Sequence, residues 1–364
     1  MTADQPGQRF DPLSAVRSAD AGCDLFLAGT VFFDLIFTGL PQLPAAGTEV
    51  WCDGMGSCPG GVANVAIAAS RLGLHTSLAA AFGDDSYGDF SWTTLSQQEG
   101  VDLSCSRRYD GWHSPVTVSM SVERDRSMVT HGHAPPQSAS EMIGDPPPAR
   151  ATLVSLGHEV DPWVVQARDA GTLLFADTGW DPSGSWSQGL LDQLEGCHAF
   201  LPNSTEAMAY TRTDDPWAAL YALADRVPLA VVTAGAHGSL AVDSLTGEEE
   251  WVPALPVNAL DPTGAGDVFA AAVITGTLAG WPLDERLAFA NLAAALAVQQ
   301  VGGSLAAPGW GDVADWWHRT RGRSTGAAVH WARRYGFLGD LVADVPPQAV
   351  RRATATIARR SDVG

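Results

Sequence analysis

The sequence predicts an α/β fold of three layers, in which helices cover both faces of a mostly parallel sheet. Apolar strands alternate with helical segments from residue 152 to residue 300, and this order is typical of parallel sheets. Two Ala-rich segments, 266–280 and 282–300, have the length of buried helices. Residues 116–122 alternate apolar and hydroxyl side chains and begin a hairpin, which predicts a second, smaller sheet.

Each element follows from a local pattern. Apolar runs that stop at turn residues predict strands, and apolar residues that share one face predict helices. The expected strands of the first half are 24–29, 31–38, 78–82, 116–122 and 127–130, and the expected helices are 60–73 and 90–99. The expected strands of the second half are 152–156, 173–176, 198–201 and 229–233, with a hairpin at 238–244 and 250–253. The expected helices are 162–170, 186–194, 206–212 and 217–226, before the two Ala-rich ones.

Composition excludes several classes of protein. The 364 residues carry a formal net charge of −20, and every cationic side chain apart from histidine is arginine. A chain without lysine has no P-loop, no Schiff-base lysine and no protein-kinase strand lysine. The acidic charge argues against nucleic-acid binding. Five scattered cysteines, no secretory signal and no membrane-spanning segment predict a cytoplasmic protein with free thiols and no membrane partner.

Periodicity and charge divide the chain into three parts. Residues 1–22 lack periodicity and are expected to be a flexible leader. Residues 23–320 have the length of one large domain or two modest ones. Residues 321–364 hold eight arginines and three acidic residues, so they form a basic tail that is solvated or docked, or that contacts an anionic partner.

The segment 261–270 places small residues and an acid at the start of a long apolar helix. Gly264, Ala265 and Gly266 allow a ligand to approach backbone amides, which form an anion site together with the helix dipole. Asp267 would repel that anion unless it acts as a base beside it. The pattern therefore predicts phosphoryl transfer, with Asp267 accepting the proton of an attacking hydroxyl. The alternative is that Asp267 caps the helix and the glycines serve packing.

The segment 59–66 places Gly60 and Gly61 before a helix and Asn64 in its first turn. The glycines permit close approach of a small polar ligand, and the Asn64 amide can donate to one hydroxyl and accept from another. A Gly-rich turn with a capping asparagine explains the same residues.

The two segments resemble the two signatures of the ribokinase-like (PfkB) carbohydrate kinases. The C-terminal signature, D-[PSTV]-x-[SAG]-[SAG]-G-D followed by small and apolar residues, fits 261–274 throughout. The N-terminal signature, a diglycine followed by N-x-A and two spaced glycines, fits up to Gly83, although Val62 stands where Gly, Ala or Pro is usual. The resemblance covers about 24–320 and implies the ribokinase-like αβα fold, with a β-sheet lid at about 31–58 and 111–133.

The resemblance also implies roles for individual residues. Asp34, Gly60, Gly61 and Asn64 would bind the sugar, and Asp267 would be the base beside the amides of Gly264, Ala265 and Gly266. Thr233, Gly235, Gly238 and Asn291 would line ATP. Asn203 and Glu206 match an N-x-x-E pattern in which Glu206 holds water on Mg²⁺, although the same spacing suits a helix capping box. Asp261 and Ser304 resemble the K⁺ site of many relatives.

The hairpin at 113–133 would be the lid, which closes over the sugar, excludes water and pairs two subunits into a homodimer. Arg124 and Arg126 at its tip are expected to be solvated charges rather than contacts to an acidic sugar. His131 and His133 are two potential metal ligands, but two histidines without a third ligand nearby do not predict a metal site.

The sequence thus predicts ATP- and Mg²⁺-dependent phosphorylation of a hydroxymethyl group on a small sugar such as ribose or fructose. A nucleoside kinase of the same fold is one alternative, because Phe32, Phe33 and Phe37 would suit an aromatic acceptor pocket. Another is a non-catalytic sugar-binding regulatory protein that uses the basic tail as an interaction arm.

Overall fold

The computed structural model describes residues 10–14, 16–17, 22–122, 125–157, 159–179, 181, 183–322 and 326–352. Most of the expected leader, Arg124, the side chain of Arg126 and the last twelve residues of the tail lie outside the described part. No helix in the described residues has both the length and the apolar character needed to cross a membrane.

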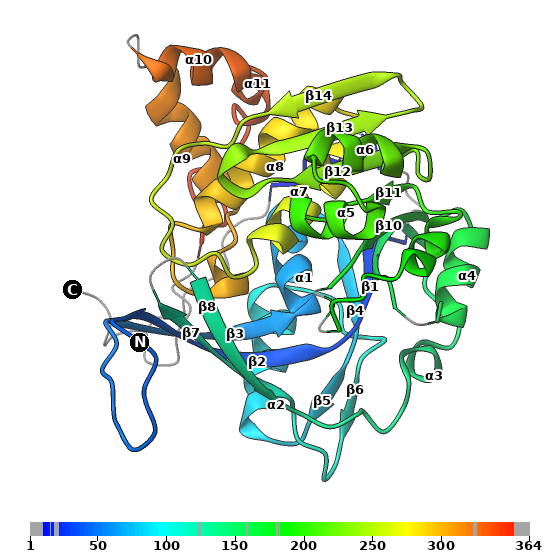
Figure 1. Ribbon diagram of the computed structural model, residues 1–364, viewed down its shortest axis with the longest axis vertical. Coiled ribbons are helices and arrows are strands. Elements are labelled where there is room, and N and C mark those ends of the chain that lie inside the picture. The colour runs from blue at the N-terminus through cyan, green and yellow to red at the C-terminus, as the bar shows by residue number, and fades with distance from the viewer. Residues whose placement is uncertain are drawn as a thin grey trace.

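The large sheet has eight strands in the order β14-β13-β12-β11-β10-β9-β1-β4 (Figure 1). The strands are β1 (Cys23–Ala28), β4 (Thr76–Ala79), β9 (Ala149–Ser155), β10 (Leu173–Asp177), β11 (Ala199–Phe200), β12 (Leu229–Thr233), β13 (Ser239–Asp243) and β14 (Glu248–Val252). Within this order the neighbours from β12 through β1 to β4 all pair in parallel. Strands β13 and β14 add an antiparallel hairpin beside β12. The predicted mostly parallel sheet is confirmed.

Helices cover both faces of this sheet, because successive side chains of each buried strand point to opposite sides. Leu25 and Leu27 join one apolar core, and Phe26 joins the other. The first core includes residues of α1 (Val62–Arg71), α7 (Ala265–Leu278) and α8 (Leu283–Ala297). The second includes residues of α4 (Pro162–Asp169), α5 (Ser204–Thr211) and α6 (Pro216–Ala224). The result is the three-layer arrangement expected from the alternation.

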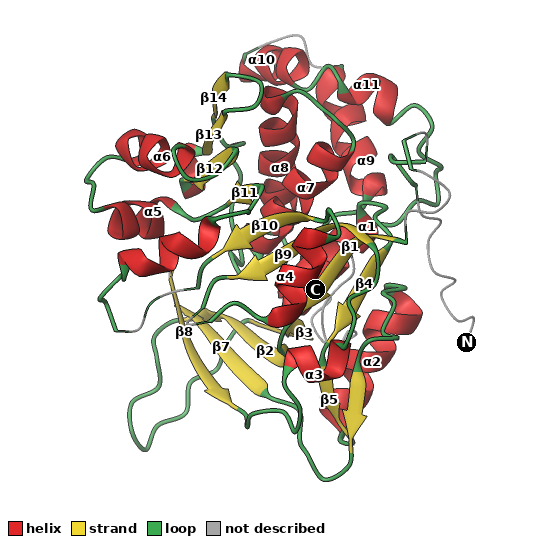
Figure 2. Cartoon of the chain, turned by 90° about the vertical axis from the view of Figure 1, so that its right-hand side faces the viewer, coloured by secondary structure: helices red, strands yellow, loops and turns green. Residues whose placement is uncertain are grey.

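A separate sheet of four strands, in the order β3-β2-β7-β8, lies below the large sheet in Figure 2. Its strands are β2 (Val31–Leu40), β3 (Gly54–Gly61), β7 (Val116–Val122) and β8 (Asp125–His131). We call it the lid sheet. Strand β3 is not predicted by the sequence, and the helix expected from residue 60 begins at Val62 instead. Four glycines and a proline among its eight residues conceal β3 in the sequence, and pairing with β2 along its whole length is what makes it a strand.

Smaller elements connect the two sheets. They are β5 (Ala81–Gly83), β6 (Arg107–Tyr109), α2 (Ser86–Thr93), which runs into a π-helical turn at Thr94–Gln98, and α3 (Ala139–Ile143). Short 3₁₀ turns occupy Gln188–Leu194, Gly235–His237 and Gly303–Ala306. The first of these stands where a longer helix, 186–194, was expected.

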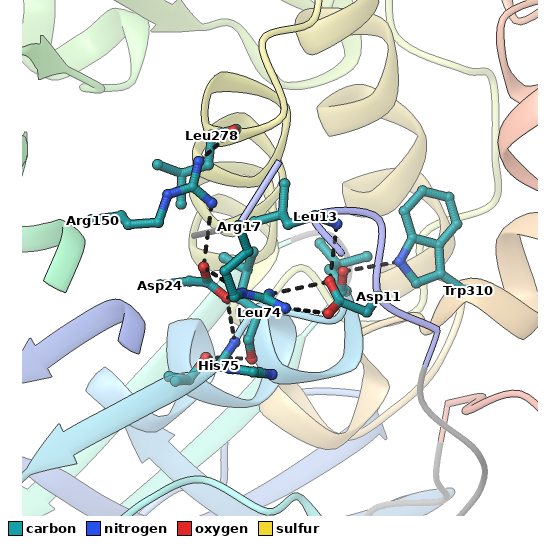
Figure 3. Close-up of polar contacts among 11 residues, drawn as sticks. Asp11, Leu13, Arg17, Asp24, Leu74, His75, Arg150, Leu278 and Trp310 are labelled. Atoms are coloured by element: carbon teal, nitrogen blue, oxygen red, sulfur yellow. Dashed lines mark hydrogen bonds and ion pairs between the residues drawn. The ribbon is translucent and has the colours of Figure 1, made fainter. Parts of the chain in front are cut away.

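Part of the expected leader is fastened to the body by ion pairs (Figure 3). Arg17 pairs with Asp11 and Asp24, and Asp24 also accepts from Arg150 and, at 2.8 Å, from the backbone amide of His75. Burial opposes ionisation of Asp24, but these hydrogen bonds outweigh it, so the pKa of Asp24 lies below its usual value. Leu13, within the same segment, is fully buried.

The basic tail contains helical segments that also pack on the body. The boundary expected at residue 320 falls within α9 (Trp310–Arg321), which α10 (Ala327–Arg334) and α11 (Leu338–Leu341) follow. Tyr335 and Leu338 are fully buried, and the ring of Tyr335 lies 4.8 Å from that of Trp316. The described part of the tail is therefore docked on the domain.

Candidate active site

The two motif segments meet at the N-terminus of α7. The Asn64 amide nitrogen, on α1, donates to the Asp267 carboxylate, on α7, at 2.9 Å. These residues are 203 positions apart in the chain, and the packing of α1 against α7 brings them together. The bond fixes the orientation of the predicted base.

Helix α7 begins without a side-chain cap. Its N-cap is Gly264, whose φ of 76° lies in the left-handed region that glycine adopts without strain. The Ala265 amide donates to the Pro262 carbonyl at 3.2 Å, so one of the three predicted anion-binding amides already has an acceptor. Within the described residues, no acceptor is recorded for the amides of Gly264 and Gly266. These two amides fit an anion site best.

On the lid side, Asp34 is buried in β2 and faces β3. A Cβ atom on Gly60 would lie 1.9 Å from a carboxylate oxygen of Asp34, so the close approach of strand and carboxylate requires glycine. Gly61 has a φ of 63°, and a Cβ there would meet the Thr30 carbonyl at 2.4 Å. Close packing therefore requires glycine at both positions, where the chain passes from β3 into α1.

Among the described residues, the buried amide oxygen of Asn64, Oδ1, has no hydrogen-bond partner, while the amide nitrogen of Asn64 is held by Asp267. A buried acceptor left unpaired costs free energy, on the order of 1–3 kcal/mol. A hydroxyl donor from a bound ligand would remove that cost. The orphaned oxygen therefore points to a hydroxylated ligand beside Asp267.

Helix α5 begins with a complete capping box. The Asn203 side chain accepts from the Glu206 amide, and the Glu206 carboxylate accepts from the Asn203 amide, each at 3.0 Å. The capping interpretation is confirmed. Burial raises the pKa of Glu206 against the effect of these hydrogen bonds, so its carboxylate gains from a nearby cation.

The Gly-rich loop after β12 lies beside this helix N-terminus. Thr233 pairs with Asn203 in an isolated bridge, which joins the loop to the capping box. A Cβ on Gly238 would meet the Val252 carbonyl at 2.1 Å, and the Asn291 amide donates to that same carbonyl at 2.9 Å. Asn291 is buried behind the loop, whereas Gly235 is exposed at its tip.

Asp177 is a carboxylate at this site that the sequence analysis missed. It ends β10, and its partly buried side chain accepts from the Thr178 amide at 2.7 Å. Desolvation, the charge of Asp267 and that of Glu206 raise the pKa of Asp177 to about 8. The signal was present, because an acid directly after a predicted parallel strand lies at the ligand-binding edge of the sheet.

The predicted cation-site residues lie in one buried loop cluster. The Asp261 carboxylate accepts from the amides of Thr263, at 2.9 Å, and Gly302, at 3.2 Å. The Ser304 hydroxyl donates to the Pro59 carbonyl, which ties this loop to the end of β3. The structure thus brings Asp261 and the 302–304 loop together.

A cavity of about 520 Å³ lies beside the lid sheet, lined by residues of β2, β8, α3 and the segments that flank the β7–β8 hairpin. Phe32 and Trp112 contribute aromatic walls, and Thr30 and His133 contribute polar groups. Phe33, by contrast, is buried against Tyr87 and Phe90, with ring centroids 4.8 and 5.3 Å apart. Of the three phenylalanines expected to suit an aromatic pocket, Phe32 alone lines this cavity.

Comparison with known proteins identifies the class to which this fold and site belong. Residues 41–309 match the pfkB family of carbohydrate kinases. The chain is 32% identical to a fructokinase of Klebsiella pneumoniae over 269 residues, 68% of this chain and 85% of that protein. It is 29% identical to a nucleoside kinase of Methanothermobacter thermautotrophicus, over 79% of this chain and 94% of that protein. The chain therefore belongs to the pfkB family, whose members transfer phosphate to an alcohol group.

Solved structures agree on the fold. An Arabidopsis thaliana ribokinase with ribose and ATP superposes with a TM-score of 0.62 at 22% identity, covering 79% of this chain and 96% of that one. A provisionally assigned ribokinase II of Escherichia coli, solved with ATP and Mg²⁺, gives 0.67 at 18% identity, covering 81% and 99%. The ribokinase-like fold is thereby confirmed.

Proposed function

We propose that this protein phosphorylates a hydroxymethyl group of a small sugar, such as ribose or fructose, with ATP as phosphoryl donor. The observation that carries the proposal is the pair formed by Asp267 and Asn64 at the uncapped N-terminus of α7. A base, a buried unpaired acceptor and backbone amides converge there, which is the set that transfer of a phosphoryl group to a hydroxyl needs.

In this reaction Asp267 accepts the proton of the attacking hydroxyl. The Asn64 amide holds the carboxylate in place, while its Oδ1 accepts from a second hydroxyl of the acceptor. Asp34, on β2, binds further hydroxyls, and Gly60 lets its carboxylate lie against β3. The amides of Gly264 and Gly266 stabilise the charge on the transferred group.

The donor side is assigned to the other helix N-terminus. ATP lies along Thr233, Gly235 and Gly238, with Asn291 behind the adenine pocket. Glu206 and Asn203, with Asp177 beside them, hold the Mg²⁺ shell, because hard cations prefer carboxylate oxygens and water. Bound Mg²⁺ supplies positive charge against the phosphates. Because the chain has no lysine, the positive field of the site would come from this cation, the α7 amides and an arginine.

The buried Asp261 and Ser304 loop is the proposed K⁺ site, because it gathers carboxylate, hydroxyl and carbonyl oxygens next to the start of α7. A bound K⁺ would order the 261–264 turn. Activity with K⁺ and with Na⁺ in its place tests this assignment directly.

One observation favours a nucleoside as a second candidate acceptor. Phe32 and Trp112 in the cavity wall could stack on a base, which a simple sugar does not offer. The name of the Methanothermobacter relative points in the same direction.

The test is an ADP-release screen with fructose, ribose, sugar acids and nucleosides as acceptors, each with K⁺ and with Na⁺. We expect turnover with one small sugar and much less with nucleosides. A nucleoside that gives the highest kcat/KM would replace the sugar assignment. Sugar binding that raises the Tm without any ADP release would instead support the non-catalytic alternative.

We also propose that the lid sheet forms a homodimer interface. Strand β8 ends the order β3-β2-β7-β8, and its residues Met128 and Val129 are 56% and 61% exposed. An exposed apolar edge strand favours pairing with a second copy. Light scattering should give the dimer mass, and the substitution Val129→Asp should lower it to that of a monomer.

A further inference from the structure

Three histidines of the lid region form a cluster outside the proposed catalytic site. The rings of His113 and His131 are stacked 5.0 Å apart, and the ring of His133 lies 4.9 and 5.2 Å from them. One ligand nitrogen of each ring lies within 4.8 Å of the other two. His131 and His133 are exposed and His113 is half-buried, so the cluster is open to solvent.

The three histidines come from the two limbs of the β7–β8 hairpin. His131 is the last residue of β8 and pairs with Val116 at the start of β7, while His133 follows two positions later. His113 precedes β7, so the third ligand comes from the opposite limb of the hairpin. This is why the sequence showed two ligands and not three.

Backbone packing holds the two limbs together. A Cβ atom on Gly132 would lie 2.7 Å from Cβ of Pro115, so glycine allows the limbs to cross at this point. The Trp112 indole nitrogen donates to the Ala134 carbonyl at 3.1 Å, and the Tyr109 hydroxyl donates to Gln137 at 2.7 Å. The histidines are therefore neighbours because of the surrounding structure.

The orientation of His113 suits a metal ligand. Its Nδ1 lies 3.1 Å from the Ser114 carbonyl, and since a carbonyl only accepts, Nδ1 carries the hydrogen. The lone pair of Nε2 is then free to coordinate. A backbone carbonyl that fixes the tautomer of a ligating histidine is the usual second partner in metal sites.

We propose that His113, His131 and His133 bind one divalent transition-metal ion, with Zn²⁺ as the best match. Three imidazoles with a fourth position open to water form a common zinc coordination set, and Mg²⁺ prefers oxygen ligands. Nitrogens of a tetrahedral zinc site lie about 3.3 Å apart, so the rings, whose ligand nitrogens lie within 4.8 Å of one another, would turn inward when the metal binds. The net charge of −20 favours the approach of a cation.

A metal bound here joins the two limbs of the lid hairpin. His133 also lines the cavity beside the lid sheet, so the metal would lie at the edge of that cavity. The site is independent of the proposed kinase chemistry, because its ligands do not include Asp267, Glu206 or Asp177.

The test uses the full-length chain without a histidine tag, freed of metal and titrated with Co²⁺ alone. We expect one equivalent to bind with the intense visible absorption of tetrahedral Co²⁺, and Zn²⁺ to displace it. His113→Ala, His131→Ala and His133→Ala should each weaken binding by more than about 100-fold, beyond the loss typical of outer-shell partners. His318→Ala, which removes an exposed histidine of α9, is the matched control and should bind normally.

Two results would overturn the proposal. One is Co²⁺ binding that the three histidine variants leave unchanged. The other is a spectrum with thiolate charge-transfer bands, which would assign the metal to cysteines. Melting curves of the metal-free variants show whether each is folded, and the double variant His131→Gln/His133→Gln keeps polar side chains if an alanine variant fails that check.

Discussion

Two helix N-termini of the site differ in how their first amides are satisfied. Helix α5 has a complete capping box, in which Asn203 and Glu206 exchange hydrogen bonds at 3.0 Å. Helix α7 has a glycine at the same position and no side-chain cap. The dipole at both N-termini favours an anion. The difference is that the capping box of α5 satisfies the amides of Asn203 and Glu206, whereas the glycine N-cap of α7 offers no side chain to its first amides.

This contrast separates the roles of the two ends. An uncapped N-terminus costs stability, and a protein retains it where a ligand supplies the missing acceptor. The α7 end is therefore suited to stabilise charge that appears during reaction. The α5 end is suited to hold a rigid carboxylate, Glu206, whose pKa burial raises above its usual value. The predictions below test that division.

The largest effect is expected from Asp267→Asn. The asparagine can still accept from Asn64, so the fold and Tm should be retained, but the proton acceptor is lost. Turnover should fall by about 10³-fold, within the range for removal of a general base. Steady-state ADP release measures this.

The matched control is Asp284→Asn, because Asp284 is an exposed acid in the first turn of the neighbouring helix α8. It should retain wild-type turnover. If Asp267→Asn keeps more than a tenth of wild-type kcat, Asp267 is not the base.

The next effect is expected from Gly264→Ala. A Cβ in this left-handed conformation costs about 1 kcal/mol of stability. It would also lie 3.4 Å from the Asn64 side chain, which orients the base. We expect kcat to fall by about 10-fold or more, because displacement of catalytic groups by even 1 Å is costly.

Gly280→Ala provides the comparison within the same helix. Gly280 has a φ of 70° beyond the C-terminal end of α7, and no atom lies within 4 Å of its would-be Cβ. It should lose similar stability and no activity. Equal losses of kcat in the two variants would mean that strain, and not the anion site, explains the result at Gly264.

How much of this site the sequence predicts depends on how local each feature is. The α7 N-terminus and the α5 capping box are each made by contiguous residues, so their spacing alone predicts them. Asp177 follows a predicted strand directly and was within reach of the same reasoning. The two-layer coverage of the sheet also follows from alternating strands and helices.

Features that need a tertiary partner were not predicted. Strand β3 is half glycine and has no strand pattern until β2 pairs with it, and the third histidine of the lid cluster stands on the opposite limb of the hairpin. The aromatic pocket was overestimated for the same reason, since only the fold decides that Phe33 packs against Phe90 and Phe32 lines the cavity.

A smaller effect distinguishes capping from ligand binding at Asn203. Asn203→Ala should cost about 1 kcal/mol, because the first turn of α5 loses its cap. Asn203→Ser restores a cap but not the amide. If Asn203 also contacts phosphate or the Mg²⁺ shell, the serine variant should recover the wild-type Tm while its KM for ATP–Mg²⁺ stays raised. Recovery of both quantities would assign Asn203 to capping alone.

The last effect is one on the dependence of stability on pH, and it concerns Asp177. Its pKa in the folded protein, about 8, lies above the value of 3.8 for an unperturbed aspartate. The native state therefore holds a proton that the unfolded state has lost, so the contribution of this group to stability falls as pH rises from about 4 to about 8. Asp177→Asn removes that slope and should be more stable than wild type at pH 8 by about 1–3 kcal/mol.

Added Mg²⁺ should shrink this difference, because a cation beside Asp177, Glu206 and Asp267 stabilises their charged forms. Urea unfolding at pH 6 and pH 8, with and without Mg²⁺, measures both effects, and the exposed Glu195→Gln serves as control. If Asp177→Asn leaves the slope of unfolding free energy against pH unaltered, the proposed coupling among the charges of Asp177, Asp267 and Glu206 is wrong.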